Sequence, residues 1–110
     1  MATHHAKPGE IVDLQTWAAD LPKEHTKAIV KTDEMELIRI VLPAGKGIPI
    51  HKVPGPVTVQ CIVGKIAIIA MDATQELNYN QLLHLKPGEP YSLKAIEDAI
   101  VLLTIIFKHP

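Results

Sequence analysis

Paired cysteines, long apolar runs and a strong excess of one charge are all missing from this chain of 110 residues. Cys61 is the single cysteine, so no intrachain disulfide can form, which is compatible with a reducing compartment. The 11 Lys and Arg residues nearly balance the 12 Asp and Glu residues, which argues against a nucleic-acid-binding surface. No segment approaches the roughly 18 apolar residues of a membrane helix, and the first residues do not resemble a secretory signal. We therefore expect a cytoplasmic protein that binds neither nucleic acid nor membranes.

Local signatures of common catalytic sites are missing as well. The chain has neither a glycine-rich phosphate loop nor a recognisable Ser-His-Asp signature. What it does have is 47% hydrophobic and 21% charged residues, a composition that favours a folded domain over intrinsic disorder. The length is enough for one domain and too short for two. We expect a single domain over residues 1–110, with an extended N-terminal segment at 1–25 and a barrel at 26–107.

From residue 26 onward, short runs rich in β-branched residues alternate with turns that contain proline or glycine. Strands are predicted for TKAIVKT, MELIRIVL, VTVQCIV, KIAIIAM, QLLHL, YSLKA and AIVLLTIIF. Segments such as PAGKG, KVPGP and KPGEP between them are turn sequences and not helix caps. The pattern predicts an all-β sandwich or barrel. Over residues 13–24 we expect extended chain or one helical turn that Pro22 ends.

The last predicted strand, AIVLLTIIF, is apolar on both faces. A small barrel covers only one face of a strand, so the second face needs a covering partner. We therefore expect a homodimer. The alternative is that the N-terminal segment with Trp17 folds over that face within one chain.

The stretch GIPIHKVPGPVTVQ contains a single histidine, and glycines flank this histidine at recognisable distances along the chain. Five residues separate Gly45 from His51, PGPVTVQCIVG then closes at Gly64, and LLHLKPGEPYSLKAIEDA follows. This spacing resembles the cupin superfamily, specifically its small single-domain members, over roughly Glu36 to Phe107. The resemblance implies a double-stranded β-helix, which is a jelly-roll barrel.

The family's metal-ligand positions are mostly occupied by other residues. The first family motif has two histidines and a glutamate, and here His51 is present while Val53 and Val57 replace the other two. In the second motif Tyr91 replaces the last histidine. Its opening glycine, proline and asparagine are replaced by Asn80, Lys86 and Ala95, while Gly88 matches.

A divalent transition metal generally needs three or more protein donors that converge on one point. His51 alone cannot supply them, valine has no lone pair, and a neutral tyrosine is a poor donor. We therefore expect no cofactor. A divalent transition metal held by His51 with non-standard ligands is the alternative.

The polar residues that can reach the barrel interior form the candidate ligand pocket: His51, Gln60, His84 and Tyr91. In a regular strand Val57, Val59 and Cys61 share the inner face, so Gln60 points inward only if a bulge follows PGP. His84 lies mid-strand between leucines, where histidine is more often a core or interface residue. We expect Cys61 to be a buried small hydrophobe and not a nucleophile.

Three functions fit these observations. The first is a cupin barrel that binds a small molecule, or only dimerises, without catalysing a reaction. The second is an enzyme: a metal-free isomerase or epimerase with His51 as base and Tyr91 as acid, or a metal-dependent oxygenase with non-standard ligands. The third is a regulatory role, because barrels of the family that the chain resembles are often fused to DNA-binding domains. We recognise no such domain in this sequence, which counts against that role. The fold alone does not choose among them.

Overall fold

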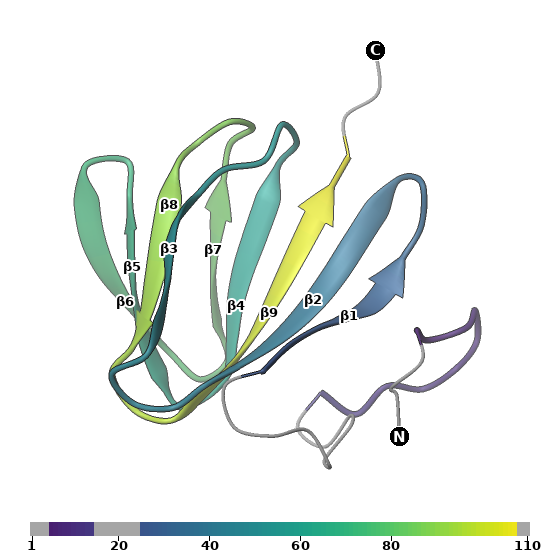
Figure 1. Ribbon diagram of the computed structural model, residues 1–110, viewed down its shortest axis with the longest axis horizontal. Coiled ribbons are helices and arrows are strands. Elements are labelled where there is room, and N and C mark those ends of the chain that lie inside the picture. Colours follow the sequence, from purple (N-terminus) through teal and green to yellow (C-terminus); the bar gives the residue numbers. More distant parts are fainter. Residues whose placement is uncertain (1–4, 15–24, 108–110) are drawn as a thin grey trace.

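The computed structural model describes residues 5–14 and 25–107, and within these ranges every regular element is a β-strand. Figure 1 shows the strands in two facing layers that lie closest at one end of the molecule. The nine strands are β1 His25–Lys31, β2 Met35–Leu42, β3 Gly47–His51, β4 Val57–Val63, β5 Lys65–Ala70, β6 Ala73–Asn78, β7 Gln81–Leu85, β8 Tyr91–Ala95 and β9 Ala99–Ile106. No helix that could cross a bilayer occurs in the described ranges.

The strands form two antiparallel sheets. The five-stranded sheet, here called sheet A, has the order β1-β2-β9-β4-β7, and the four-stranded sheet B has the order β3-β8-β5-β6. Neighbours in each sheet are mostly distant in sequence, so the chain crosses repeatedly from one sheet to the other. This arrangement confirms the predicted all-β fold.

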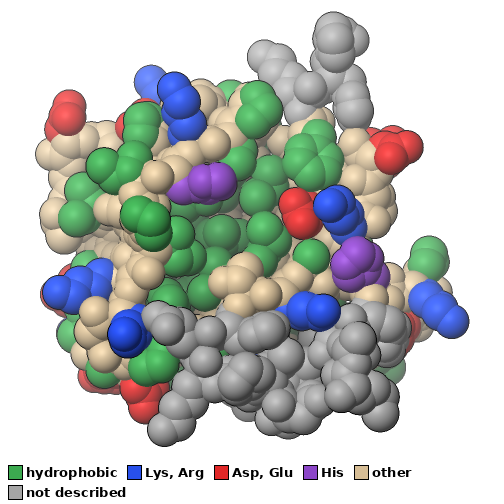
Figure 2. Space-filling view, in the orientation of Figure 1, with side chains coloured by type: hydrophobic (Ala, Val, Ile, Leu, Met, Phe, Trp, Pro, Cys, Tyr) green, Lys and Arg blue, Asp and Glu red, His purple; other side chains and the backbone are tan. Residues whose placement is uncertain are grey.

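Side chains on the inner faces of the two sheets make one aliphatic core. Burial alternates along β4, where Val57, Val59 and Cys61 are buried and the residues between them are half-buried. β8 alternates likewise, with Tyr91, Leu93 and Ala95 facing inward. Figure 2 shows hydrophobic side chains gathered across the middle of the visible face, between the layers. The two-residue period of the pleat thus places the hydrophobic set between the sheets.

Gly64 makes the step from β4 in sheet A to β5 in sheet B. Its φ of +82° lies in the left-handed region, which glycine adopts without a steric penalty. A Cβ at this position would overlap the carbonyl oxygen of Asp98. Glycine is therefore required twice here, by the backbone conformation and by the close approach of the β8–β9 loop.

The outer face of β9 is largely covered within one chain. Leu102 is only 7% exposed, and its neighbour Arg39 on β2 is buried and donates from Nε to the carbonyl oxygen of Leu14 at 2.8 Å. Among the outward-facing residues of β9, Ile106 is the exposed one. The two-faced apolar pattern of β9 therefore does not by itself require a second molecule. Trp17 and residues 15–24 lie outside the described residues.

Seven of the nine strands fall where the sequence predicts them, and two do not. β3, GIPIH, and β6, ATQELN, lie in segments where the sequence predicts no strand. Both are the edge strands of sheet B. β6 has a single buried residue, Leu77, so its sequence shows almost no alternation.

Candidate functional site

His51 and Tyr91 meet at one end of sheet B, where the last residue of β3 pairs with the first residue of β8. Their rings lie edge to face, with 5.9 Å between centroids and an interplanar angle of 86°. His51 is exposed whereas Tyr91 is 2% exposed. The pair therefore runs from the surface into the core.

The hydroxyl of Tyr91 is a polar atom inside the hydrophobic core. It is buried and has no hydrogen-bond partner among the described residues. Burial raises the pKa of the phenol, so the group stays protonated at neutral pH. A buried hydroxyl without a partner costs about 1 to 3 kcal/mol, so the position favours a bound polar group.

Val53 and Val57 follow His51 closely in sequence and belong to the same core as Tyr91. Val57 is buried within the core cluster, and Val53 packs against that cluster from the loop after β3. Neither side chain has a donor atom. Within residues 5–14 and 25–107, no group of three His, Cys, Asp or Glu side chains is placed to hold a metal ion.

Two loops meet beside the pair. The Gly88 amide donates to the carbonyl oxygen of Val53 at 2.9 Å, which links the β7–β8 loop to the β3–β4 loop. A hollow of about 250 Å³ lies at this junction and is lined by Lys52, Val53, Pro54 and Gly88. Gly88 has a φ of +78° with open space at its Cβ position, so it serves the turn and not a close contact.

A second hollow of about 330 Å³ reaches Tyr91 from the outer side of sheet B. Its lining includes Glu89, whose Oε2 accepts from the Met71 amide at 3.2 Å and whose Oε1 lies 4.0 Å from Lys86 Nζ. Sequence reasoning did not single out Glu89. The sequence could have indicated it, because Glu89 is the charged residue of the KPGEP turn that directly precedes Tyr91.

Gln60 and His84 do not join His51 and Tyr91. β4 keeps a regular register through Gln60, which pairs with Leu82 and Leu102 on the outer face of sheet A. His84 pairs with Thr58 on the same outer face and is exposed. Because β4 keeps its alternation up to Cys61, the structure brings together only two of the four candidate pocket residues.

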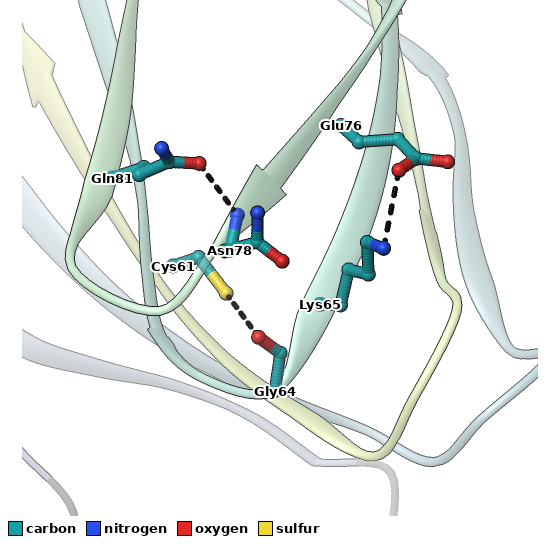
Figure 3. A network of polar contacts seen from close by, with 6 residues as sticks. All are labelled: Cys61, Gly64, Lys65, Glu76, Asn78 and Gln81. Atoms are coloured by element: carbon teal, nitrogen blue, oxygen red, sulfur yellow. Dashed lines mark hydrogen bonds and ion pairs between the residues drawn. The ribbon is translucent and has the colours of Figure 1, made fainter.

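Cys61 lies buried at the opposite end of β4 from Val57. Its thiol contacts the carbonyl oxygen of Val63 at 3.4 Å and that of Gly64 at 3.5 Å. Figure 3 shows the contact with Gly64. Burial, and to a smaller extent the charge of Glu97, raises the pKa of the thiol. A raised pKa lowers the thiolate fraction at neutral pH, which disfavours a nucleophilic role.

The turns around Cys61 rest on local polar contacts. The Asn80 amide donates to the Cys61 carbonyl oxygen at 2.7 Å. The Asn78 amide donates to Gln81 Oε1 at 2.8 Å, as Figure 3 shows. Asn80 has a φ of +68° at the position where the family motif has its opening glycine. Asparagine tolerates this left-handed conformation better than most residues, so the substitution preserves the turn.

Comparison with known proteins identifies the fold. No protein-family model matches the chain, and no curated protein matches it in sequence. A conserved Streptococcus pyogenes protein of unknown function superimposes with a TM-score of 0.81 at 19% identity, covering 100% of this chain and 97% of that one. A cupin superfamily protein from Desulfitobacterium hafniense gives 0.80 at 10% identity, covering 94% and 95%.

An RmlC-like cupin from Desulfovibrio desulfuricans gives a TM-score of 0.70 at 18% identity and covers 96% of each chain. The chain therefore has the cupin fold, the double-stranded β-helix, at the size of a small single-domain cupin. The predicted resemblance is confirmed at the level of the fold. Identities this low carry no information on ligand or reaction.

Proposed function

We propose that this cupin barrel binds a small molecule at the end where His51 meets Tyr91, without a complete metal site and without catalysing a reaction. The observation that carries the proposal is the buried, unpartnered hydroxyl of Tyr91 in an aliphatic core. Small-ligand sites usually combine apolar walls with a few convergent polar groups, and this end of the barrel has that composition.

The chemistry of the pair limits the ligand. Tyr91 can donate one hydrogen bond and accept another, while His51 presents an exposed imidazole at the mouth. The valines at 53 and 57 favour an apolar body. The ligand class that fits is a small aliphatic molecule with one carbonyl, carboxylate or hydroxyl oxygen.

Entry requires movement of the loops at the mouth, because the Tyr91 hydroxyl is shielded from solvent. The backbone hydrogen bond between Gly88 and Val53 joins the two loops beside the pair. A single backbone hydrogen bond contributes about 0.5 to 1.5 kcal/mol, so opening this contact costs little free energy.

The test is an NMR titration of uniformly labelled protein with C3–C8 carboxylates, ketones and alcohols. Binding is expected to shift the methyl signals of Val53 and Val57 and to weaken in Tyr91→Phe. Tyr79→Phe, at a 66% exposed tyrosine, is the matched control. Equal binding by Tyr91→Phe, or shifts confined to the outer-face residues Gln60 and His84, would reject the site.

Metal analysis of protein purified without an affinity tag tests the second half of the proposal. The expected result is no stoichiometric iron, manganese, zinc, nickel or copper. Stoichiometric metal would overturn the metal-free assignment and favour a metalloenzyme with non-standard ligands.

A metal-free proton transfer is the second candidate, favoured by the ring contact between His51 and the protonated Tyr91. His51→Ala separates binding from structure. For a ligand-contacting His51, affinity falls by about 1 to 3 kcal/mol while the melting temperature barely changes. For an enzyme, substrate turnover falls as well. A lower melting temperature with unchanged affinity would make His51 structural.

A further inference from the structure

The β3–β4 loop and the β7–β8 loop meet at the end of the barrel where His51 lies. Figure 1 shows these loops side by side at the wide end of the molecule, where the two layers diverge. The hollow of about 250 Å³ beside the contact between Gly88 and Val53 is lined in part by Lys52. Its volume is just below the range of about 300 to 1,000 Å³ that is typical of small-ligand pockets. This hollow, here called the mouth, therefore has room for one end of a small molecule.

Lys52 gives the mouth a positive charge. It is exposed and has no ion-pair partner among the described residues, and the exposed His51 precedes it. Glu89 of the facing loop is bound elsewhere: its Oε2 accepts from the Met71 amide at 3.2 Å, and its Oε1 lies 4.0 Å from Lys86 Nζ. Glu89 lines the hollow on the outer side of sheet B and is not among the described residues that line the mouth. The mouth therefore favours an anionic group.

The buried hydroxyl of Tyr91 requires a different kind of partner. The core cluster to which Tyr91 belongs contains no charged side chain within the described part of the chain. A carboxylate buried there would lose its hydration without gaining a cation, and this loss exceeds what one hydrogen bond returns. A neutral hydroxyl or carbonyl oxygen can pair with the phenol without that penalty. The ligand oxygen that reaches Tyr91 is therefore uncharged.

We propose that the ligand has two polar ends: an uncharged hydroxyl or carbonyl oxygen that binds Tyr91, and a carboxylate that stays at the mouth beside Lys52. The ligand class is thus a small linear hydroxy or oxo carboxylate. This inference rests on the proposed function, because the ligand must first reach Tyr91. An exposed ion pair contributes less affinity than a buried hydrogen bond that satisfies an unpartnered group. Lys52 therefore selects among ligands that Tyr91 already holds.

Probes that differ at one end only can separate the two contributions. They are linear ω-hydroxy carboxylates of the C3–C6 series, the matching ω-hydroxy amides, and the matching carboxylates without the hydroxyl. NMR titration of labelled protein gives each affinity, with the Val53 methyl signals as the readout. At low salt, the wild type is expected to bind the best hydroxy carboxylate about threefold to fivefold more tightly than its amide. It should bind the same compound at least fivefold more tightly than the carboxylate without the hydroxyl.

Two variants assign these preferences to residues. Lys52→Gln is expected to abolish the preference for carboxylate over amide and to leave the affinity for the amide unchanged, which also shows that the variant is folded. Tyr91→Phe is expected to abolish the preference for the hydroxyl and to keep the preference for carboxylate over amide. Lys94→Gln, at an exposed lysine on the outer face of sheet B, is the matched control and should keep both preferences.

The outcomes distinguish this inference from the proposed function. Equal binding of carboxylate and amide, with Tyr91→Phe still weakening both, overturns the two-ended ligand and leaves the site at Tyr91 standing. A carboxylate preference that survives Lys52→Gln, or that Lys94→Gln abolishes, overturns the inference by placing the carboxylate elsewhere. If no probe shifts the Val53 signals, or if Tyr91→Phe binds every probe as the wild type does, the proposed function fails and this inference fails with it.

Discussion

The edge-to-face contact between His51 and Tyr91 joins an exposed imidazole to a phenol whose hydroxyl is buried without a partner in the described residues. The contact arises because β3 and β8 pair antiparallel with His51 opposite Tyr91. Two positions that the family motifs assign to metal ligands are thus brought together, as those motifs require. The residues at these positions supply one imidazole and one neutral phenol, and not a metal-binding set.

Removing the Tyr91 hydroxyl is expected to leave the free protein as stable as wild type, or up to about 1 kcal/mol more stable. The reason is that Tyr91→Phe deletes a buried polar atom without a partner and keeps the ring in the core. Urea unfolding followed by circular dichroism measures the change, with Tyr79→Phe as control. A loss of 1 kcal/mol or more would mean that the hydroxyl is hydrogen-bonded in the free protein, which removes the main support for a ligand there.

Alkaline pH is expected to destabilise the fold through Tyr91 and Cys61. Burial raises the pKa of both groups, so the folded chain keeps protons that the unfolded chain releases. Their stabilising contribution is complete below the unfolded pKa values, about 8.5 for cysteine and 10 for tyrosine, and is lost as pH rises through the folded values. The slope is at most about 1.4 kcal/mol per pH unit for each proton.

Unfolding free energies measured from pH 8 to pH 11 check this prediction. The double variant Tyr91→Phe, Cys61→Ala should show a flatter profile than wild type. Tyr79→Phe should keep the wild-type profile. If the double variant loses stability over this range as steeply as wild type, other groups cause the alkaline transition.

Most of the fold is predictable because the interior strands carry strong local patterns. β4, β5, β8 and β9 contain runs of β-branched and aliphatic residues bounded by turn residues, so their existence and inner faces follow from the sequence. β3 and β6 are edge strands with mostly exposed side chains, and their pairing depends on the neighbouring strand more than on their own sequence. The β5–β6 turn is also hard to predict from the sequence, because Met71 has a φ of +53° and methionine rarely adopts this left-handed conformation.

Less of the candidate site is predictable, because side-chain direction depends on strand register. A single bulge after PGP would have turned Gln60 inward, and no local sequence feature decides whether it forms. The structure shows a regular strand there, with the irregularity only after Cys61. The unpartnered state of the Tyr91 hydroxyl is a property of the assembled core, so it too lies beyond sequence reasoning.

Gly64→Ala is expected to destabilise the protein by more than about 3 kcal/mol, whereas Gly88→Ala should cost about 1 kcal/mol. Both glycines have positive φ values, +82° and +78°, so both substitutions carry the left-handed penalty. Only at Gly64 does the added Cβ also overlap backbone, the Asp98 carbonyl oxygen. Chemical denaturation of the two variants isolates this steric contribution. Equal losses would mean that the β8–β9 loop moves aside freely.

Restoring the family ligands is expected to create a metal site. Val53→His, Val57→Glu and Tyr91→His together with His51 place four donors at the motif positions, two of which the His51–Tyr91 contact already brings together. The metal-free triple variant should be less stable than wild type, because Val57 is 2% exposed and a glutamate there buries a charge. Cobalt or nickel should then raise its stability, by about 2.7 kcal/mol when the free metal is at 100 times the dissociation constant.

Isothermal titration and thermal unfolding with and without metal measure this gain. Val53→His alone is the control. It should bind metal no more tightly than wild type, since it adds one imidazole to that of His51 and a metal generally needs three or more protein donors. If wild type binds cobalt or nickel as tightly as the triple variant, the loss of the metal site inferred from Val53, Val57 and Tyr91 is wrong. If the triple variant folds and binds nothing, the four positions do not converge, and the motif alignment fails at Val53 or Val57, the two positions that no ring contact anchors.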